Sequence, residues 1–218
     1  MNSQKLRRIV AMIAPRAMRL VLAGCVVVLM LGTGHAQSSG AQGVVDHFYT
    51  VLLQAMKNGP ALGPRGRFQQ LEPEIRADFD LASMTRLAVG AAWRHLSSDD
   101  RQRLRDAFTR YTTATYAQNF DSWSGEKLEV TGQRDGGFGT IVESRIVKSD
   151  GEPVQMDYLM HDNGSKWQIA DIYLTGTISQ LANLRSQFSA ILARDGVGGL
   201  IASLNSKADM LVAAAETR

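Results

Sequence analysis

The chain contains very little cysteine. Its 218 residues include a single one, Cys25, which lies in an apolar stretch near the N-terminus. One cysteine cannot form an intramolecular disulfide, so burial of apolar side chains must stabilise the fold. Aromatic residues make up only 7% of the chain and there are only 5 prolines. Long helices and a largely aliphatic core are therefore compatible with this composition.

Motifs of the common enzyme classes are also missing from the sequence. It has no Gly-x-Ser-x-Gly elbow, no phosphate-binding glycine loop and no dinucleotide fingerprint, and Gly136-Gly137 is better interpreted as a hairpin turn. The histidines beyond the N-terminal segment, His47, His95 and His161, are far apart and show no metal-ligand spacing. We therefore predict no catalytic residue, no metal site and no cofactor.

The N-terminal segment combines positive charge with one short apolar run. Its charged residues are all basic: Lys5, Arg7, Arg8, Arg16 and Arg19. Apolar residues 20–31 follow, and small residues lead to Ala36, a pattern that predicts a secretory signal peptide over residues 1–36. One alternative is an uncleaved anchor. A second is lipidation at Cys25, which is disfavoured because the arginines just before it leave almost no apolar run ahead of the processing box.

Removal of this segment reverses the sign of the net charge. The chain has 24 basic and 21 acidic residues, and five of the basic ones lie in residues 1–36, which leaves 19 against 21, or −2 instead of +3. The remainder has no basic run with interleaved aromatics, so no nucleic-acid partner is predicted. We predict a single domain over residues 37–218, with residues 37–43 mobile.

Helical periodicity dominates the first part of this domain. Apolar residues within 44–55 fall on one side of a helix that should end near residues 58–60. A loop around Gly63-Pro64 is expected next. Asp80 and Ser97 each precede a helical pattern, so both side chains are predicted N-caps.

Beyond residue 127 the apolar period changes to two. Strands are predicted around residues 127–130, 141–147, 154–160 and 167–174. Short turns rich in Gly, Asn and Asp separate them, so successive strands should be antiparallel neighbours. Trp167, Ile169 and Tyr173 should share one face of the last strand. Two helices are expected to close the chain, the second over about residues 199–215.

This order of elements predicts an α+β fold. We expect a four-stranded antiparallel meander sheet, with helices before and after it packed on one face around an apolar pocket. The candidates for the sheet wall of the pocket are Val142, Ile146, Met156, Tyr158, Met160, Trp167, Ile169 and Tyr173. The matching helix candidates are Phe108, Tyr111, Leu184 and Phe188. Part of this set must form solid core.

Several segments also occur together in an order found in one known family. They are Phe79-Asp80 with Met84, residues 87–93, residues 97–103, Tyr116, Gly125-Glu126, Asp157-Tyr158, residues 167–188 and residues 196–200. In this order and spacing, nearly all of residues 44–207 resembles the toluene-tolerance family of soluble lipid carriers of the MlaC type. The closest resemblance is to the branch associated with hopanoid biosynthesis.

The resemblance implies a non-enzymatic periplasmic carrier with bound lipid as its cargo and no cofactor. The wall and helix candidates named above would bind the lipid, a phospholipid or a hopanoid. The implied partners are an outer-membrane lipoprotein complex and an inner-membrane ABC transporter with its substrate-binding subunit. Two other classes stay open: a small pocket enzyme on a nuclear-transport-factor-like fold, and an adaptor of a membrane complex that binds no lipid.

Two carboxylates lie on predicted strands among apolar neighbours. Asp157 and Asp171 each suit a general base in a pocket, but a hydrogen-bonded carboxylate at a sheet edge is the simpler interpretation. Asp171 is also a candidate partner of Arg185 in a structural ion pair. Arg185 has an alternative role, in which it binds a lipid headgroup at the pocket mouth.

Overall fold

The computed structural model describes residues 40–213 of the chain. The predicted signal peptide, its cleavage point after Ala36 and Cys25 lie outside these residues. Residues 41–43, predicted to be mobile, form the first turn of a helix. The described elements are α2 (Ala41–Lys57), α3 (Gly59–Asp78), α4 (Leu81–Val89), η1 (Gly90–His95), α5 (Ser98–Asn119), β1 (Lys127–Asp135), β2 (Thr140–Val147), β3 (Pro153–Asp162), β4 (Trp167–Leu174), β5 (Ile178–Ser179) and α6 (Gln180–Ala213).

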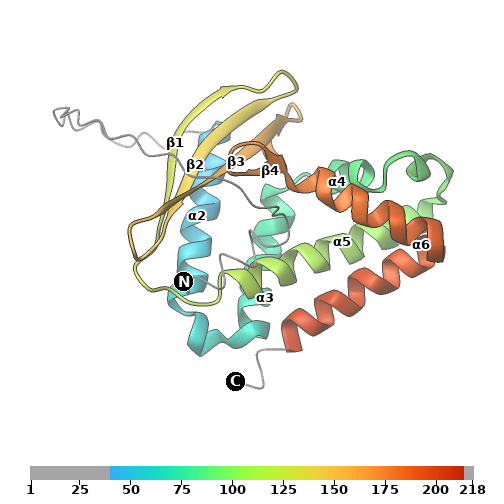
Figure 1. Ribbon diagram of the computed structural model, residues 1–218, viewed down its shortest axis with the longest axis horizontal. Helices are drawn as coiled ribbons and strands as arrows, with labels where there is room; N and C mark the ends of the chain where they lie inside the picture. The colour runs from blue at the N-terminus through green and yellow to red at the C-terminus, as the bar shows by residue number, and fades with distance from the viewer. Residues whose placement is uncertain (1–39, 214–218) are drawn as a thin grey trace, which may run out of the picture.

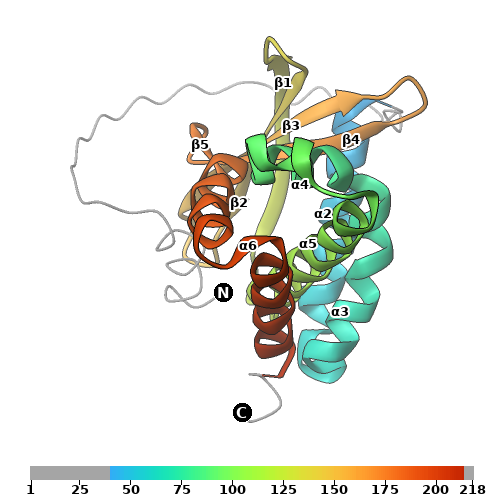
Figure 2. The same ribbon diagram turned by 90° about the vertical axis from the view of Figure 1, so that its right-hand side faces the viewer.

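The strands form one antiparallel sheet in the order β1-β2-β3-β4-β5. α2 contacts β1 to β4, whereas α3, α4 and α6 contact the sheet at β4, an arrangement that Figures 1 and 2 show from two sides. The chain is therefore α+β, with an antiparallel sheet and helices on both sides of it. No helix within residues 40–213 has the length and apolar character needed to span a membrane.

The sheet has five strands, so the prediction of four was wrong. The additional strand, β5, pairs Ile178 with Leu174 and Ser179 with Tyr173. It has only 2 residues, which is too short for an alternating pattern to be detected in the sequence. The prediction that the helices pack on one face of the sheet was also wrong, because they lie on both sides of it. α6 begins at the sheet edge directly after β5.

The two predicted N-caps are confirmed. The Asp80 carboxylate accepts a hydrogen bond from the backbone N–H of Ser83 at 3.0 Å, and Ser97 Oγ accepts one from Asp100 N–H at 3.0 Å. These side chains satisfy backbone donors that a helix leaves free in its first turn. They fix where α4 and α5 begin.

α2 packs against the helical part of the molecule and also against the sheet. Its buried Phe48 ring lies edge-on to Phe79, 5.1 Å between ring centres, and edge-on to Tyr116 at 5.2 Å. Tyr49 turns to the sheet, where its hydroxyl donates to Ser144 Oγ at 2.6 Å, and Ser144 in turn donates to the Met156 carbonyl. Burial raises the pKa of Tyr49 to about 12, so the phenol stays protonated and the chain of hydrogen bonds persists.

A bulge in β4 changes which side chains face the helices. Met160 pairs with Ile169, but Leu159 pairs with Asp171, so Ala170 is an extra residue between them. Because an extra residue inverts the alternation of side chains, Ile169 and Tyr173 lie on opposite faces. The prediction that they share a face was therefore wrong, and Ile172 and Leu174 take the inward positions.

The C-terminal helix is divided by a glycine. α6 runs from Gln180 to Ala213, but Gly196 has φ 66° and ψ −169°, which no helix contains. Figure 2 shows the resulting change of direction. The two predicted closing helices are thus two segments of α6 that meet at this glycine. α3 has a similar break at Gly63 (φ 60°), where the sequence predicted a loop.

Candidate functional site

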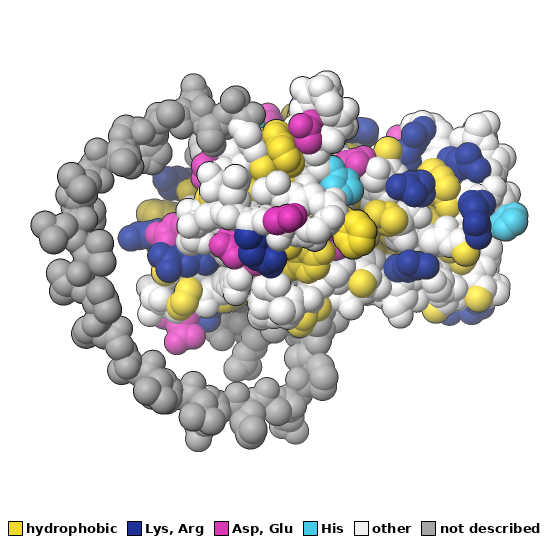
Figure 3. Space-filling view, turned by 90° about the horizontal axis from the view of Figure 1, so that it is seen from above, with side chains coloured by type: hydrophobic (Ala, Val, Ile, Leu, Met, Phe, Trp, Pro, Cys, Tyr) yellow, Lys and Arg dark blue, Asp and Glu magenta, His cyan; other side chains and the backbone are white. Residues whose placement is uncertain are grey.

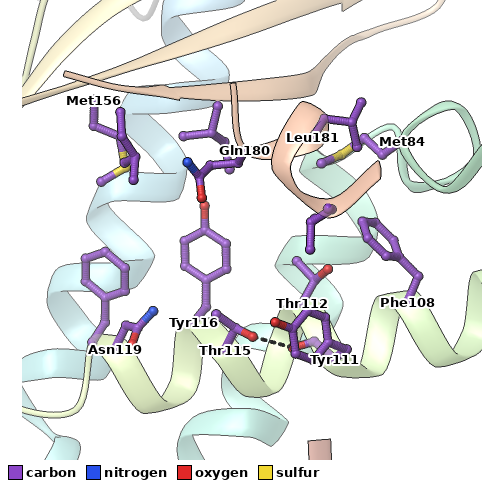
Figure 4. A pocket seen from close by; sticks show the side chains of 14 residues that line it. Met84, Phe108, Tyr111, Thr112, Thr115, Tyr116, Asn119, Met156, Gln180 and Leu181 are labelled. Carbon is purple, nitrogen blue, oxygen red and sulfur yellow. Dashed lines mark hydrogen bonds between the residues drawn. The ribbon is translucent and has the colours of Figure 1, made fainter. Parts of the chain in front are cut away.

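A cavity of about 130 Å³ lies between the sheet and the helices α4, α5 and α6. α5 forms its floor, while β3, β4 and the start of α6 lie opposite (Figure 4). Its lining residues are Met84, Phe108, Tyr111, Thr112, Thr115, Tyr116, Asn119, Phe120, Met156, Ile172, Leu174, Gln180, Leu181 and Leu184. Most of this wall is apolar.

α5 presents the cavity with a continuous stripe of side chains. Phe108, Thr112, Thr115 and Asn119 recur at helical spacing, so they project from one side of the helix. Thr115 turns its hydroxyl back to the carbonyl of Tyr111 at 2.8 Å, the dashed line in Figure 4. This bond satisfies the hydroxyl within the helix, so Thr115 offers mainly its methyl group to the cavity.

The opposite wall comes from the sheet and from α6. Met156 and Leu174 are directly paired across β3 and β4, and both are buried. Leu181 and Leu184 descend from the first turns of α6, where the half-buried Gln180 points toward Tyr116 (Figure 4). Half-buried polar groups thus lie beside an apolar interior, an arrangement that suits a molecule with an apolar body and a polar end.

The cavity wall carries no residue that is charged at neutral pH. None of its 14 lining residues is Asp, Glu, His, Cys, Lys or Arg. Burial raises the pKa of the Tyr111 and Tyr116 hydroxyls, so both stay neutral. Such a wall can exclude water and hold an apolar group, but it offers no general acid or base of ordinary strength.

Four of the predicted lipid-binding residues line this cavity. They are Phe108, Tyr111, Met156 and Leu184. Phe188 lies behind the wall, with its ring edge-on to Phe108 at 6.2 Å between centres. Five others are fully buried in the core away from the lining: Val142, Ile146, Tyr158, Met160 and Ile169. Trp167 and Tyr173 are half-buried on β4 and do not line the cavity either.

Asp171 and Arg185 form no ion pair within the described part of the chain. The Asp171 carboxylate accepts hydrogen bonds from Ser179 Oγ at 2.5 Å and from Leu181 N–H at 3.0 Å. Burial raises the pKa of Asp171, and these donors oppose the rise. Asp171 therefore fixes the start of α6, and the predicted pairing with Arg185 was wrong because nearer backbone and hydroxyl donors occupy the carboxylate. Arg185 is exposed and lies against η1 instead.

Asp157 also has a structural environment. Its side chain is fully buried, and it accepts hydrogen bonds from Gln155 Nε2 at 2.9 Å and from Ser144 N–H at 3.3 Å. It does not line the cavity. The interpretation of Asp157 as a hydrogen-bonded carboxylate agrees with these contacts.

The structure brings His47 close to two carboxylates, which its sequence position did not suggest. His47, Glu74 and Asp78 place one ligand atom each within 4.8 Å of one another, and His47 Nε2 lies 2.9 Å from Glu74 Oε2. Burial raises the pKa of Asp78 to about 6. Glu74 and Asp78 are four residues apart on α3, so the helix itself brings them together with a residue of α2.

Comparisons with known proteins agree on one family. The family model described as "MlaC protein" matches residues 46–206. A solved structure of a phospholipid-binding protein from Ralstonia solanacearum, in complex with a phospholipid, aligns with a TM-score of 0.69 and 25% sequence identity. The alignment covers 79% of this chain and 98% of that one. No curated protein sequence matches the chain.

Together, the fold and the site define an α+β protein whose sheet and helices enclose an apolar cavity. The matched region spans most of the chain, and the predicted family resemblance is confirmed. The chain belongs to the MlaC family.

Proposed function

We propose that this protein is a periplasmic carrier of a two-tailed membrane lipid, whose acyl chains enter the cavity between α5, α6 and the sheet. The observation that carries the proposal is the uncharged apolar cavity in a chain of the MlaC family. The similar Ralstonia solanacearum structure, which contains a phospholipid, supports phospholipid as the cargo. The cavity wall without carboxylate or histidine favours a carrier over a pocket enzyme.

Energetics explain why such a carrier needs membrane partners. Two tails of about fifteen methylenes each, at about 0.8 kcal/mol per methylene, differ by roughly 24 kcal/mol between water and an apolar site. This exceeds the practical ceiling of about 18 to 21 kcal/mol for noncovalent affinity, so release into water is impractical. Relative to a bilayer the tails are already out of water. A cavity that matches the bilayer to within a few kcal/mol can therefore exchange lipid in either direction.

The cavity must widen to hold two tails. Its volume of about 130 Å³ is below the roughly 300 to 1,000 Å³ of pockets that hold even drug-sized ligands. The first segment of α6 is the element best placed to move, because it is bounded by Gly176 (φ 75°) and Gly196 (φ 66°). Rotation about these two points would separate Leu181 and Leu184 from α5. The short strand β5 lies within the moving segment and would leave β4, whereas β1 to β4 would stay paired.

The direction of transport would come from other proteins. No nucleotide-binding motif is present in the sequence, so the carrier has no energy source of its own. We propose that it exchanges lipid with an outer-membrane lipoprotein complex and with an inner-membrane ABC transporter, reached after export through a cleaved signal peptide over residues 1–36. A hopanoid is the alternative cargo, and it would need a wider and stiffer cavity than flexible tails do.

Filling the cavity tests this proposal. Leu184→Trp adds a large side chain at the cavity wall, and we expect lipid bound to the purified protein to fall at least tenfold while the protein stays folded. The control is Ala182→Trp, because Ala182 is exposed on the same helix and its replacement should leave the lipid content unchanged. Quantitative mass spectrometry of extracted lipid gives the content, and circular dichroism reports folding. A folded Leu184→Trp protein with full lipid content would contradict the proposed site.

A further inference from the structure

A second hollow, of about 350 Å³, lies on the outer surface of α4, η1 and α6. Its lining combines three arginines, Arg86, Arg94 and Arg185, with the apolar surfaces of Leu87 and Trp93. All three arginines are exposed, and Leu87 retains 39% of its surface accessible to solvent. In Figure 3, basic side chains gather beside hydrophobic ones at the right-hand end of the molecule, over α4 and η1. We call this surface the arginine hollow.

The positive charge of the arginine hollow is not balanced locally. Residues 81–98 and residues 179–193, which form its two sides, contain no Asp or Glu. Within the described part of the chain, none of its three arginines makes a salt bridge, whereas Arg103 nearby lies 3.5 Å from Asp100. The hollow therefore combines three uncompensated guanidinium groups with exposed apolar surface, although the domain from residue 37 onward has a net charge of −2.

Local packing holds the groups of the arginine hollow in place. A Cβ atom added to Gly90 (φ 68°) would lie 3.1 Å from Arg185 Nε, so glycine lets this guanidinium lie close to η1. On the other side, the Arg101 guanidinium stacks over the Trp93 ring at 5.6 Å and donates to the Trp93 carbonyl at 3.3 Å. These contacts fix the Trp93 ring and the Arg185 guanidinium at the edge of the hollow.

We propose that the arginine hollow docks the protein on an anionic lipid bilayer. Guanidinium groups bind phosphate oxygens in a planar, two-pronged geometry, and basic residues near an anionic membrane gain attraction from its surface potential. Trp93 and Leu87 match the interfacial region, where indole and aliphatic side chains insert between headgroups. An acidic protein surface would satisfy the arginines but would not need the exposed Leu87 or the half-buried Trp93 beside them.

The position of the hollow relative to the cavity supports this assignment, which rests on the proposed carrier function. Leu184 lines the cavity and the next residue, Arg185, lines the hollow. On α4, Met84 lines the cavity and Arg86, two residues further on, lines the hollow. A bilayer held against the arginine hollow would therefore lie beside the α4 and α6 wall of the lipid cavity. Docking would shorten the distance that a lipid tail travels between bilayer and cavity.

Vesicle binding tests the docking surface. The full chain is expressed and exported, and the purified protein is sedimented with vesicles of phosphatidylcholine alone or mixed with phosphatidylglycerol. We expect binding only to the anionic vesicles, and weaker binding in 0.5 M salt because the Debye length falls below about 5 Å. Replacing all three arginines (R86Q/R94Q/R185Q) should weaken binding about 100-fold, since each basic residue near the surface contributes about fivefold.

A charge-matched control separates location from net charge. The variant R65Q/K127Q/K148Q removes three positive charges, from α3, from β1 and from the turn that follows β2, and its binding should stay within twofold of the unmodified protein. Equal loss in both variants would overturn the proposal, as would equal binding to neutral vesicles. A third outcome would overturn the bilayer as the partner: the unmodified protein binds no vesicles but binds an acidic polypeptide such as polyglutamate, and R86Q/R94Q/R185Q loses that binding. The partner of the arginine hollow would then be an acidic protein. Lipid content is measured in parallel: vesicle binding by a protein without cargo would refute the carrier function but not the docking surface.

Discussion

Asp78 shows how one side chain can set the pH dependence of the whole fold. Its carboxyl is half-buried near the end of α3, and burial raises its pKa to about 6, with His47 and Lys166 opposing the rise and Glu74 adding to it. One of its oxygens is buried and has no hydrogen-bond partner within the described part of the chain. A raised carboxyl pKa means that the folded chain binds more protons than the unfolded chain between about pH 4 and 6.

The stability contributed by Asp78 is therefore fully present below about pH 4 and is lost as the pH rises through 6. Asp78→Asn cannot ionise and should escape this loss. We expect the free energy of unfolding of the variant, relative to that of the unmodified protein, to be about 1 kcal/mol more favourable at pH 8 than at pH 4, after allowing for solvent screening. Urea unfolding at both pH values measures the difference.

An exposed carboxylate provides the control for this prediction. Glu152 lies in the turn before β3 and is exposed, so Glu152→Gln should change stability by the same small amount at both pH values. If Asp78→Asn also shows no pH-dependent gain, then the Asp78 carboxyl does not titrate as its burial implies.

At the scale of elements, local signals were sufficient where one residue determines the geometry. Asp80 and Ser97 were recognised as N-caps because the bond from a cap to the helix joins residues three apart in the chain. The bulge at Ala170 had no such signal, since it is defined only by the pairing of β4 with β3. β5 was missed for the same reason: two residues become a strand only when a partner strand is present.

Gly196 allows an element-scale test of the break in α6. Its φ of 66° is unfavourable for any side chain, although no atom lies within 4 Å of an added Cβ. Gly196→Ala should therefore destabilise the protein by about 1 kcal/mol through the backbone alone. If Gly196→Ala proved as well tolerated as Gly198→Ala, a substitution in the same helix, then α6 would be continuous in solution.

Gly198 is the matched control, two residues further along α6. It also has no atom within 4 Å of an added Cβ, and its φ lies outside the positive range. Gly198→Ala should stabilise the helix by roughly 0.5 to 1 kcal/mol, because alanine has the higher helix propensity. Thermal unfolding of the two variants side by side gives opposite shifts in Tm if the kink at Gly196 is present.

At the scale of the whole molecule, the sequence predicted the layers better than the cavity between them. Opposed apolar faces follow from periodicity, and both the sheet and α5 have such faces. Which side chains border empty space depends on how the layers pack, so Met156 and Leu184 line the cavity whereas Ile146 and Met160 fill the core. Ile172 and Leu174 line the cavity because the extra residue Ala170 inverts the alternation of side chains in β4. In a strand without this bulge, both would point away from the cavity.

The most direct test of the carrier account is native mass spectrometry of the protein purified gently after export. The account predicts a complex of one chain with one two-tailed lipid, and lipid fragmentation should identify a phospholipid. The same spectrum gives the mass of the mature chain, which should begin after Ala36. A protein that is folded and consistently free of lipid under these conditions would contradict the central claim, that the cavity between sheet and helices opens to hold a membrane lipid.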